Sequence, residues 1–144
     1  MRALNSMSAD EYLRQLRHID ALVRNRQLEY HHWREIAEGF GSFSAGDKVQ
    51  SSKNLQQIPD AIGRYIDIER EVEGLKLKRL EILGTIEQLP TEEYDLLYRY
   101  YALGHSLKEI AFHLKKGYDR VKVIKREGLD MVQRILDERA QRGA

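Results

Sequence analysis

Hydrophobic residues recur at three- and four-residue steps in five stretches of the chain, which predicts a protein built of helices. The first stretch, residues 8–38, opens with Ser8 and Glu11 at capping-box spacing, and only Arg26 breaks its apolar seam. The second stretch, residues 59–88, starts at Pro59, a residue that suits the first turn of a helix. Its seam runs through Ile62, Tyr65, Ile68, Val72, Leu75, Ile82, Ile86 and Leu89. We therefore expect an all-α fold.

The connection between these two stretches, residues 39–58, carries no helical period. Its first part, Gly39–Asn54, is rich in Gly and Ser, which predicts a long loop that joins an antiparallel helical hairpin. Pro90 then restrains Leu89 from helical geometry, and Thr91 can cap the next helix. The expected organisation is a hairpin domain over residues 1–90 and a second helical domain over residues 91–144.

Tyrosines mark the third stretch, which spans residues 92–103. They form one helical stripe with Leu97, and Gly104 follows at a position that can end the helix. Such tyrosines can stack on exposed bases, but helical spacing favours packing in a core. We assign Tyr94, Leu97, Tyr98 and Tyr101 to packing.

A short helix is predicted next, because Ser106 and Glu109 form a second capping box ahead of Leu107. Its inward face consists of Leu107, Ile110, Ala111 and Leu114. Gly117 then interrupts the pattern and is expected to adopt a positive φ in a tight turn. A helix, a tight turn and a further helix in this order are typical of a helix-turn-helix.

The last helix, about residues 118–136, has one apolar stripe and a polar side opposite to it. The stripe consists of Val121, Ile124, Gly128, Val132 and Ile135. With about 100° per residue, the outward residues and their two flanks can be assigned from the stripe alone. The candidate DNA-binding residues on and around this side are Lys116, Tyr118, Asp119, Arg120, Lys122, Val123, Lys125 and Arg126.

The outward residues carry the chemistry that reads base edges in a DNA major groove. Lys122 and Arg126 can donate to guanine O6 and N7, and Asp119 can accept from a cytosine amino group. Val123 can pack on a thymine methyl group. On the flanks, Arg120 and Lys125 would bind phosphates, which fixes register and not sequence.

Positive charge is concentrated in this part of the chain. Residues 105–126 hold seven Lys or Arg and two acids, a net charge of +5, whereas the whole chain carries +1. The rest is therefore net acidic. A local basic region favours a defined docking surface for double-stranded DNA over a general polyanion-binding tail.

Composition favours a non-enzyme in a reducing cytoplasm that does not bind a membrane. The 144 residues are 42% hydrophobic and 33% charged, and no run approaches the roughly 18 apolar residues of a membrane span. Without cysteine there is no thiol catalysis and no Cys-based zinc site. Neighbouring His31 and His32 point about 100° apart on a helix, which disfavours a shared metal. No phosphate-loop, dinucleotide or nucleophile-elbow motif occurs, so no cofactor is expected.

The segment from Thr91 to Leu136 resembles region 4 of bacterial sigma factors. That family has a short helix with an L-x-E-I-A core, matched here by Leu107–Ala111, and a recognition helix of the form R-E-R-V-R-Q-I, aligned with Tyr118–Ile124. The resemblance implies promoter-contacting roles for Asp119, Arg120 and Lys122. Tyr118 and Val123 stand where the family has Arg and Gln, which implies a target other than the usual promoter hexamer.

Over nearly its full length the chain resembles the small sigma-region-4-like regulators of phages and prophages, the ArpU-like and RinA-like families. This resemblance implies activation of late phage genes in a bacterial host. Our leading hypothesis is that the hairpin pairs with RNA polymerase, a second copy of the chain or another phage factor. Two alternatives remain open from the sequence. One is a DNA-packaging protein of the small-terminase type, and the other is an interaction module whose basic helix meets an acidic protein. The plainest interpretation of the basic helix itself is a solvated, lysine-rich face on an ordinary helical bundle.

Overall fold

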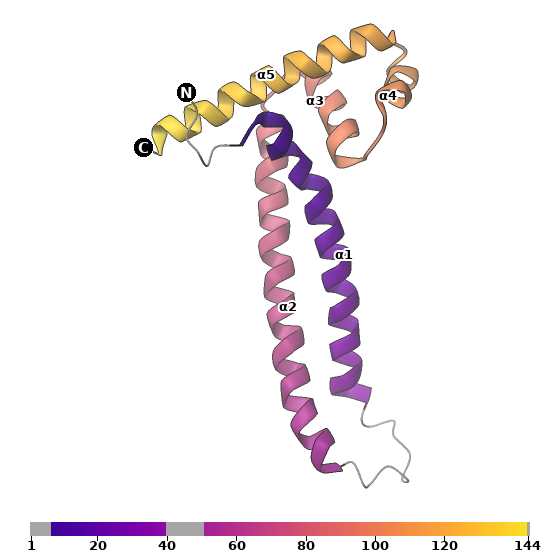
Figure 1. Ribbon diagram of the computed structural model, residues 1–144, viewed down its shortest axis with the longest axis vertical. Helices are drawn as coiled ribbons and strands as arrows, with labels where there is room; N and C mark the ends of the chain where they lie inside the picture. Colours follow the sequence, from indigo (N-terminus) through magenta and orange to yellow (C-terminus); the bar gives the residue numbers. More distant parts are fainter. Residues whose placement is uncertain (1–6, 40–50, 144) are drawn as a thin grey trace. The chain divides into compact units, whose positions relative to one another are not determined.

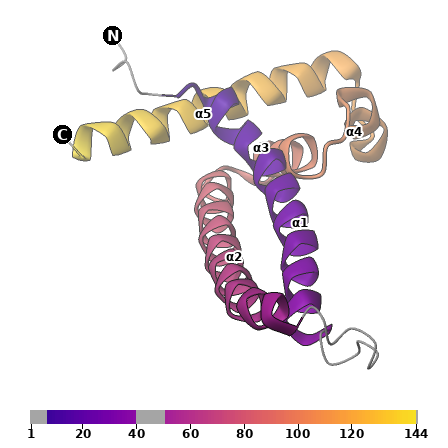
Figure 2. The same cartoon turned by 60° about the horizontal axis from the view of Figure 1, so that its bottom comes forward.

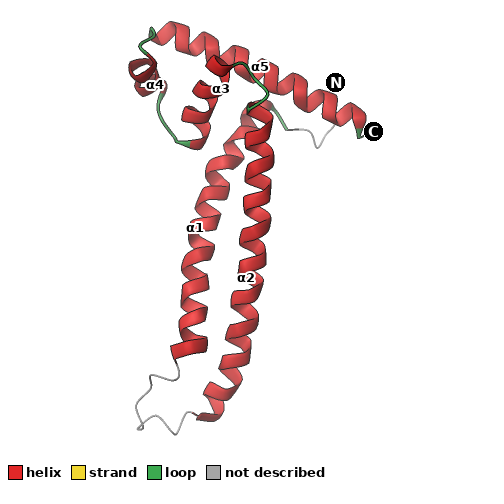
Figure 3. Ribbon diagram, turned by 180° about the vertical axis from the view of Figure 1, so that it is seen from behind, coloured by secondary structure: helices red, strands yellow, loops and turns green. Residues whose placement is uncertain are grey.

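The computed structural model describes residues 7–39 and 51–143, with side chains from residue 57 onward in the second range. Every regular element within these ranges is a helix (Figure 3). The elements are α1 (Ala9–Gly39), α2 (Ser51–Ile86), α3 (Thr91–Leu97), a π-helical turn η3 (Tyr98–Ala102), α4 (Leu107–Leu114) and α5 (Tyr118–Arg142). The expected all-α class is confirmed for these residues.

The start of α2 corrects the sequence prediction. The helix begins at Ser51 and carries Pro59 inside it, whereas the predicted helix began at Pro59. A proline removes one backbone hydrogen bond and crowds the preceding turn, but the helix can continue on both sides of it. The predicted loop over residues 39–58 is therefore shorter at this end, and residues 40–50 of that loop lie outside the described ranges.

The chain forms two compact units that do not follow the predicted boundary at Pro90. One unit joins residues up to Ile19 with residues from Lys78 onward, and the other is Asp20–Leu77. The first turns of α1 and the last turns of α2 thus belong to the same unit as α3, α4 and α5. Sequence periodicity cannot place this boundary, because both long helices continue through it without a break.

Within the unit Asp20–Leu77, the two helical segments run antiparallel and side by side (Figure 1). Arg26 Nε lies 2.8 Å from Glu71 Oε2, and Arg64 Nη2 lies 3.5 Å from Glu29 Oε2. The residue that breaks the apolar seam of α1 therefore has an ionic partner on α2. Ala61, Ile68 and Val72 are buried, whereas Ile62, predicted for the inner seam, is 38% exposed. Its position one residue beyond Ala61 turns it away from α1.

The other unit holds a larger core, to which every helix of the unit contributes. Its buried side chains are Leu13 and Leu16 of α1, Ile82 and Ile86 of α2, Leu96 and Leu97 of α3, Ile110 of α4, and Val121, Ile124 and Val132 of α5. The first turns of α1 lie against α5 (Figure 2), where the Ala9 N–H donates to Gln133 Oε1 at 2.8 Å. Tyr12 adds polar contacts between the helices of this unit. Its hydroxyl lies 3.0 Å from Thr85 Oγ1 of α2 and accepts a hydrogen bond from Arg139 of α5 at 3.4 Å.

The tyrosine segment is helical, but its last turn is a π-helical turn, which is wider than the predicted α-helical turn. After α3, the Leu103 N–H donates to the Tyr98 carbonyl at 3.1 Å, which widens the last turn into η3. Leu97 and Tyr101 are buried, and Tyr94 and Tyr98 are half-buried, so the packing role is confirmed for the first pair. Gly104, with φ of 76°, ends the segment as predicted. Thr91 does not cap α3, because Pro90 occupies the cap position and no side chain caps that end.

A hydrogen-bond chain joins α1 to η3. The Tyr101 hydroxyl donates to Asp10 Oδ1 at 2.5 Å, and Arg14 Nε lies 2.7 Å from Asp10 Oδ2. Burial alone would raise the pKa of the Asp10 carboxyl, but the hydrogen bonds from Arg14 and Tyr101 outweigh it and hold that pKa below its ordinary value of 3.8. The ionised carboxylate is therefore the form that the folded chain stabilises.

This arrangement predicts a loss of stability in acid that depends on Asp10. Because its pKa is lower in the folded chain than in the unfolded chain, the contribution of Asp10 is present above pH 3.8 and is lost as the pH falls below that value. We expect Asp10→Asn to lower the melting temperature at pH 6 and to converge with wild type as the pH falls toward 3. Thermal melts followed by circular dichroism test this, and a pH-independent difference between the two proteins would contradict it.

Candidate nucleic-acid interface

The amino end of α4 is fixed by a capping box. The Glu109 N–H donates to Ser106 Oγ at 3.1 Å, and the Ser106 N–H donates back to Glu109 Oε1 at 3.4 Å. Two backbone N–H groups that a helix end leaves without a partner are thereby satisfied. The predicted capping box and the predicted first residue, Leu107, are both confirmed.

The turn between α4 and α5 corrects the prediction for Gly117. The left-handed residue is Lys115, with φ of 56° and ψ of 44°, whereas Gly117 is extended, with φ of −67°. The Lys115 N–H donates to the Phe112 carbonyl at 3.3 Å, and the Lys116 N–H donates to the Ala111 carbonyl at 3.0 Å. These two hydrogen bonds require a left-handed backbone conformation at the residue directly after α4, which is Lys115. That conformation costs a non-glycine residue about 1 kcal/mol. Gly117 instead occupies the N-cap position of α5, without a side-chain hydrogen bond.

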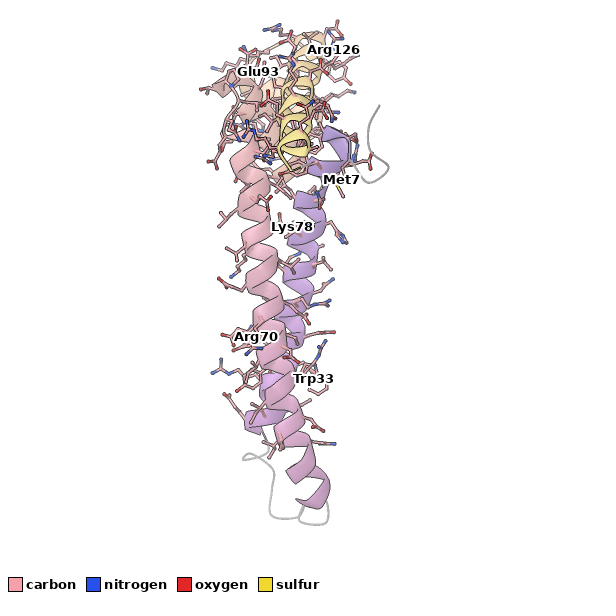
Figure 4. All side chains as sticks on the ribbon, turned by 90° about the vertical axis from the view of Figure 1, so that its left-hand side faces the viewer. Met7, Trp33, Arg70, Lys78, Glu93 and Arg126 are labelled. Atoms are coloured by element: carbon pink, nitrogen blue, oxygen red, sulfur yellow. The ribbon has the colours of Figure 1, made fainter. Side chains whose placement is uncertain are left out.

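Helix α5 buries one side and exposes the other. Val121, Ile124, Gly128 and Val132 are buried, as predicted, and Ile135 at the end of the stripe is half-buried. Most of the candidate DNA-binding residues are exposed: Lys116, Tyr118, Asp119, Arg120, Lys122 and Arg126. The other two, Val123 and Lys125, are half-buried. The cationic side of α5 is thus accessible over about two turns (Arg126 is marked in Figure 4).

Part of this cationic side borders a groove between α5 and the start of α4. The groove has a volume of about 490 Å³ and is lined by Leu107, Tyr118, Lys122, Lys125, Arg126, Leu129 and Asp130. The ammonium groups of two lysines lie over aromatic rings. Lys122 Nζ is 5.2 Å from the centre of the Tyr118 ring, and Lys125 Nζ is 4.3 Å from that of Tyr100. These contacts restrict both side chains while their charges stay accessible.

Two of the candidate DNA-binding cations already have a partner within the chain. Arg120 Nη2 lies 3.1 Å from Glu92 Oε1, and Lys116 Nζ lies 3.7 Å from Glu92 Oε2. No local pattern links these residues, because Glu92 is 28 residues before Arg120 and belongs to α3. All three side chains are more than one third exposed, so each ion pair contributes at most about 1 kcal/mol.

A second hollow adds two cations that the sequence did not indicate. It has a volume of about 360 Å³ and is lined by Arg14, Arg17, Tyr100, Tyr101, Gly104, His105, Ser106 and Glu109. Arg14 and Arg17 are three residues apart on one face of α1, a spacing that could have marked them as a pair. Nothing in the sequence places that face beside Ser106, which follows about ninety residues later in the chain.

The position of Arg17 depends on Gly104. A Cβ atom at Gly104 would lie 2.7 Å from Arg17 Nη1, and its φ of 76° is a conformation that side chains disfavour. Glycine at this position therefore lets the guanidinium lie against the backbone. Nearby, His105 Nδ1 is buried without a hydrogen-bond partner among the described residues.

The two hollows border neighbouring residues and together form one cation-rich surface. Ser106 lines the second hollow, and its neighbour Leu107 lines the groove. Lys125, which lines the groove, lies over the ring of Tyr100, which lines the second hollow. Five Lys or Arg and two acids line them: Lys122, Lys125, Arg126, Arg14 and Arg17, against Asp130 and Glu109. Such a surface is suited to a polyanion.

Other kinds of site find little support in the described part of the chain. No group of three or more His, Cys, Asp or Glu there could hold a metal ion. Nor does any helix within the described ranges have the length and apolar character needed to cross a membrane. Comparison of the chain with protein-family models, with curated proteins and with solved structures gives no significant match.

Proposed function

We propose that the protein binds duplex DNA through α4, the turn after it and α5, which act together as a helix-turn-helix. In this arrangement the second helix enters the major groove, and its first residues contact base edges. The observation that carries the proposal is the exposure of Lys122 and Arg126 on the side of α5 opposite its buried stripe. A helix packed the other way round would offer valine and isoleucine to the groove.

Each candidate residue is assigned a role from its position. Lys122 and Arg126 donate to guanine, Asp119 accepts from cytosine, and Val123 contacts a thymine methyl group. Tyr118 supports Lys122, whose ammonium lies over its ring. Lys116, Arg120 and Lys125 bind phosphates, joined by Arg14 and Arg17 of α1 beside the amino end of α4.

The biological role that we propose is transcription regulation of the phage or prophage type. This part rests on the resemblance of Leu107–Ala111 and Tyr118–Ile124 to sigma-factor region 4, whereas the geometry supports the docking of DNA alone. In this role the long helices α1 and α2 associate with RNA polymerase or with a second copy. A single helix-turn-helix makes few base contacts and gains affinity from such an association.

Titration of a labelled duplex at several salt concentrations tests the proposal. If four to six phosphates are neutralised, the logarithm of the association constant should fall with the logarithm of salt concentration at a slope of about −4 to −5. Lys116→Ala should weaken all duplexes alike and reduce the slope by up to about one, because it removes a phosphate contact. The proposal fails if duplex DNA does not bind at about 50 mM salt, where nonspecific electrostatic binding is strong.

A further inference from the structure

A face of α2 within the unit Asp20–Leu77 has no partner in the described part of the chain. Ile66, Arg70, Glu73 and Leu77 follow one another at steps of four, three and four residues, which places them within about 60° on one side of the helix. All four are exposed, Ile66 by 39% and Leu77 by 61%. The buried residues Ile68 and Val72 lie on the opposite side, toward α1 (Arg70 is marked in Figure 4).

The charged residues of this face, Arg70 and Glu73, are not among the ion-paired residues of the unit that the structure describes. Arg26 and Arg64 are paired with Glu29 and Glu71 across the two helices. Arg70 and Glu73 make no ion pair among the described residues, although both line a shallow hollow of about 350 Å³ with Ile66 and Glu69. An arginine and a glutamate one turn apart, with apolar residues one turn beyond on each side, suit a partner that supplies the opposite charges.

The order of the four residues is self-complementary. Read forward it is apolar, cation, anion, apolar, and read backward it is apolar, anion, cation, apolar, with the same 4-3-4 spacing. A two-fold axis that crosses α2 between Glu71 and Val72 would place Ile66 against Leu77 of the second copy. The same axis would place Arg70 against Glu73 of that copy, twice. Self-complementarity of one patch is the requirement for a two-fold dimer interface.

We propose that a second copy of this chain docks on this face, with the two α2 helices antiparallel. The parallel arrangement would set Arg70 against Arg70, and like charges in contact oppose association. A contact of about three helical turns is small for a stable dimer, so we expect a weak one, with a dissociation constant on the order of 10 µM. The dimer does not depend on DNA binding, because its residues are separate from the proposed DNA interface.

Charge reversal tests the dimer in the full chain without DNA. Arg70→Glu alone and Glu73→Arg alone each create two like-charge contacts, so each should weaken the dimer by about tenfold or more. The double variant Arg70→Glu/Glu73→Arg restores opposite charges and should return to within about threefold of wild type. Lys78→Glu is a matched control, since it reverses an exposed cation of α2 that lies about 120° from this face. Sedimentation equilibrium gives the dissociation constants, and circular dichroism checks that each variant is folded.

Three results would overturn the proposal. The first is a wild-type chain that stays monomeric up to about 1 mM, a hundred times the expected constant. The second is a double variant as weak as the single ones, because it would show that Arg70 and Glu73 do not meet across the interface. The third is a ring of eight or more copies, the stoichiometry typical of a packaging protein. The first two results do not concern DNA, so the dimer and the proposed DNA binding can fail independently.

Discussion

Replacement of Lys122 and Arg126 together by alanine is expected to weaken binding to a selected DNA duplex by about a thousandfold. In the proposed function each side chain donates to a guanine, and loss of such a contact costs about 1 to 3 kcal/mol. Two losses of about 2 kcal/mol each amount to roughly a thousandfold in affinity. Alanine is the strongest helix former, and both residues are exposed, so α5 should stay folded. Fluorescence anisotropy with a duplex selected from random sequence measures the change.

Arg134→Ala is the matched control, because it removes an exposed cation of the same helix about two turns beyond Arg126. We expect it to change affinity by less than about threefold, an amount typical of loss of one distant charge. The double variant should also lose its preference between the selected duplex and a scrambled one. Equal affinity of the double variant and wild type for the selected duplex would remove the base-contact assignment of Lys122 and Arg126.

Gly128→Leu is expected to lower the free energy of unfolding by about 3 kcal/mol, near the upper end of the cost of overfilling a core. At this glycine α5 touches α3. A Cβ atom would lie 3.0 Å from Leu97 Cδ1 and 3.4 Å from Glu93 Cβ, and Leu97 is fully buried. The further carbons of leucine would have no space unless the two helices separate. Urea denaturation followed by circular dichroism measures the loss.

Gly84→Leu provides the comparison for Gly128→Leu. It introduces the same side chain into a helical glycine of the same unit, but nothing lies within 4 Å of the added Cβ atom. There the higher helix propensity of leucine should raise stability by a few tenths of a kcal/mol up to about 1 kcal/mol. If both variants lost stability equally, the close approach of α3 and α5 at Gly128 would not be the cause.

Local signals in the sequence were sufficient for much of the fold and for the orientation of α5. The capping box at Ser106 and Glu109 involves residues three apart, and the stripe through Val121, Ile124 and Val132 follows from helical periodicity alone. Both depend on neighbours in one helix, so no tertiary information was needed. The exposure of Lys122 and Arg126 then follows from the stripe.

The left-handed residue of the α4–α5 turn and the first residue of α2 could not be predicted in the same way. Gly117 is the residue with the lowest cost for a positive φ, but the hydrogen bonds that end α4 required that conformation at Lys115. Pro59 is a common first residue of a helix, and α2 nevertheless begins eight residues before it. In both cases the intrinsic preference of a residue was weaker than the geometry of the segment around it.

Contacts between residues far apart in the sequence could not be predicted from helical periodicity. The sequence placed Arg120 and Lys116 beside the recognition surface but did not show that Glu92 binds both. It also contained Arg14 and Arg17 without any sign that η3 and α4 lie next to them. The proposed interface is therefore larger than the predicted one, and three of its cations, Lys116, Arg120 and Arg14, already have an ionic partner within the chain.

Glu92 acts as a counterion that is built into the chain. A phosphate that approaches Lys116 or Arg120 must displace a carboxylate that cannot diffuse away, instead of a mobile ion that would gain entropy on release. These two cations should therefore add less to the salt dependence of binding than Lys122 or Arg126. They should also favour ligands that carry two adjacent phosphates, which can replace both oxygens of Glu92 at once.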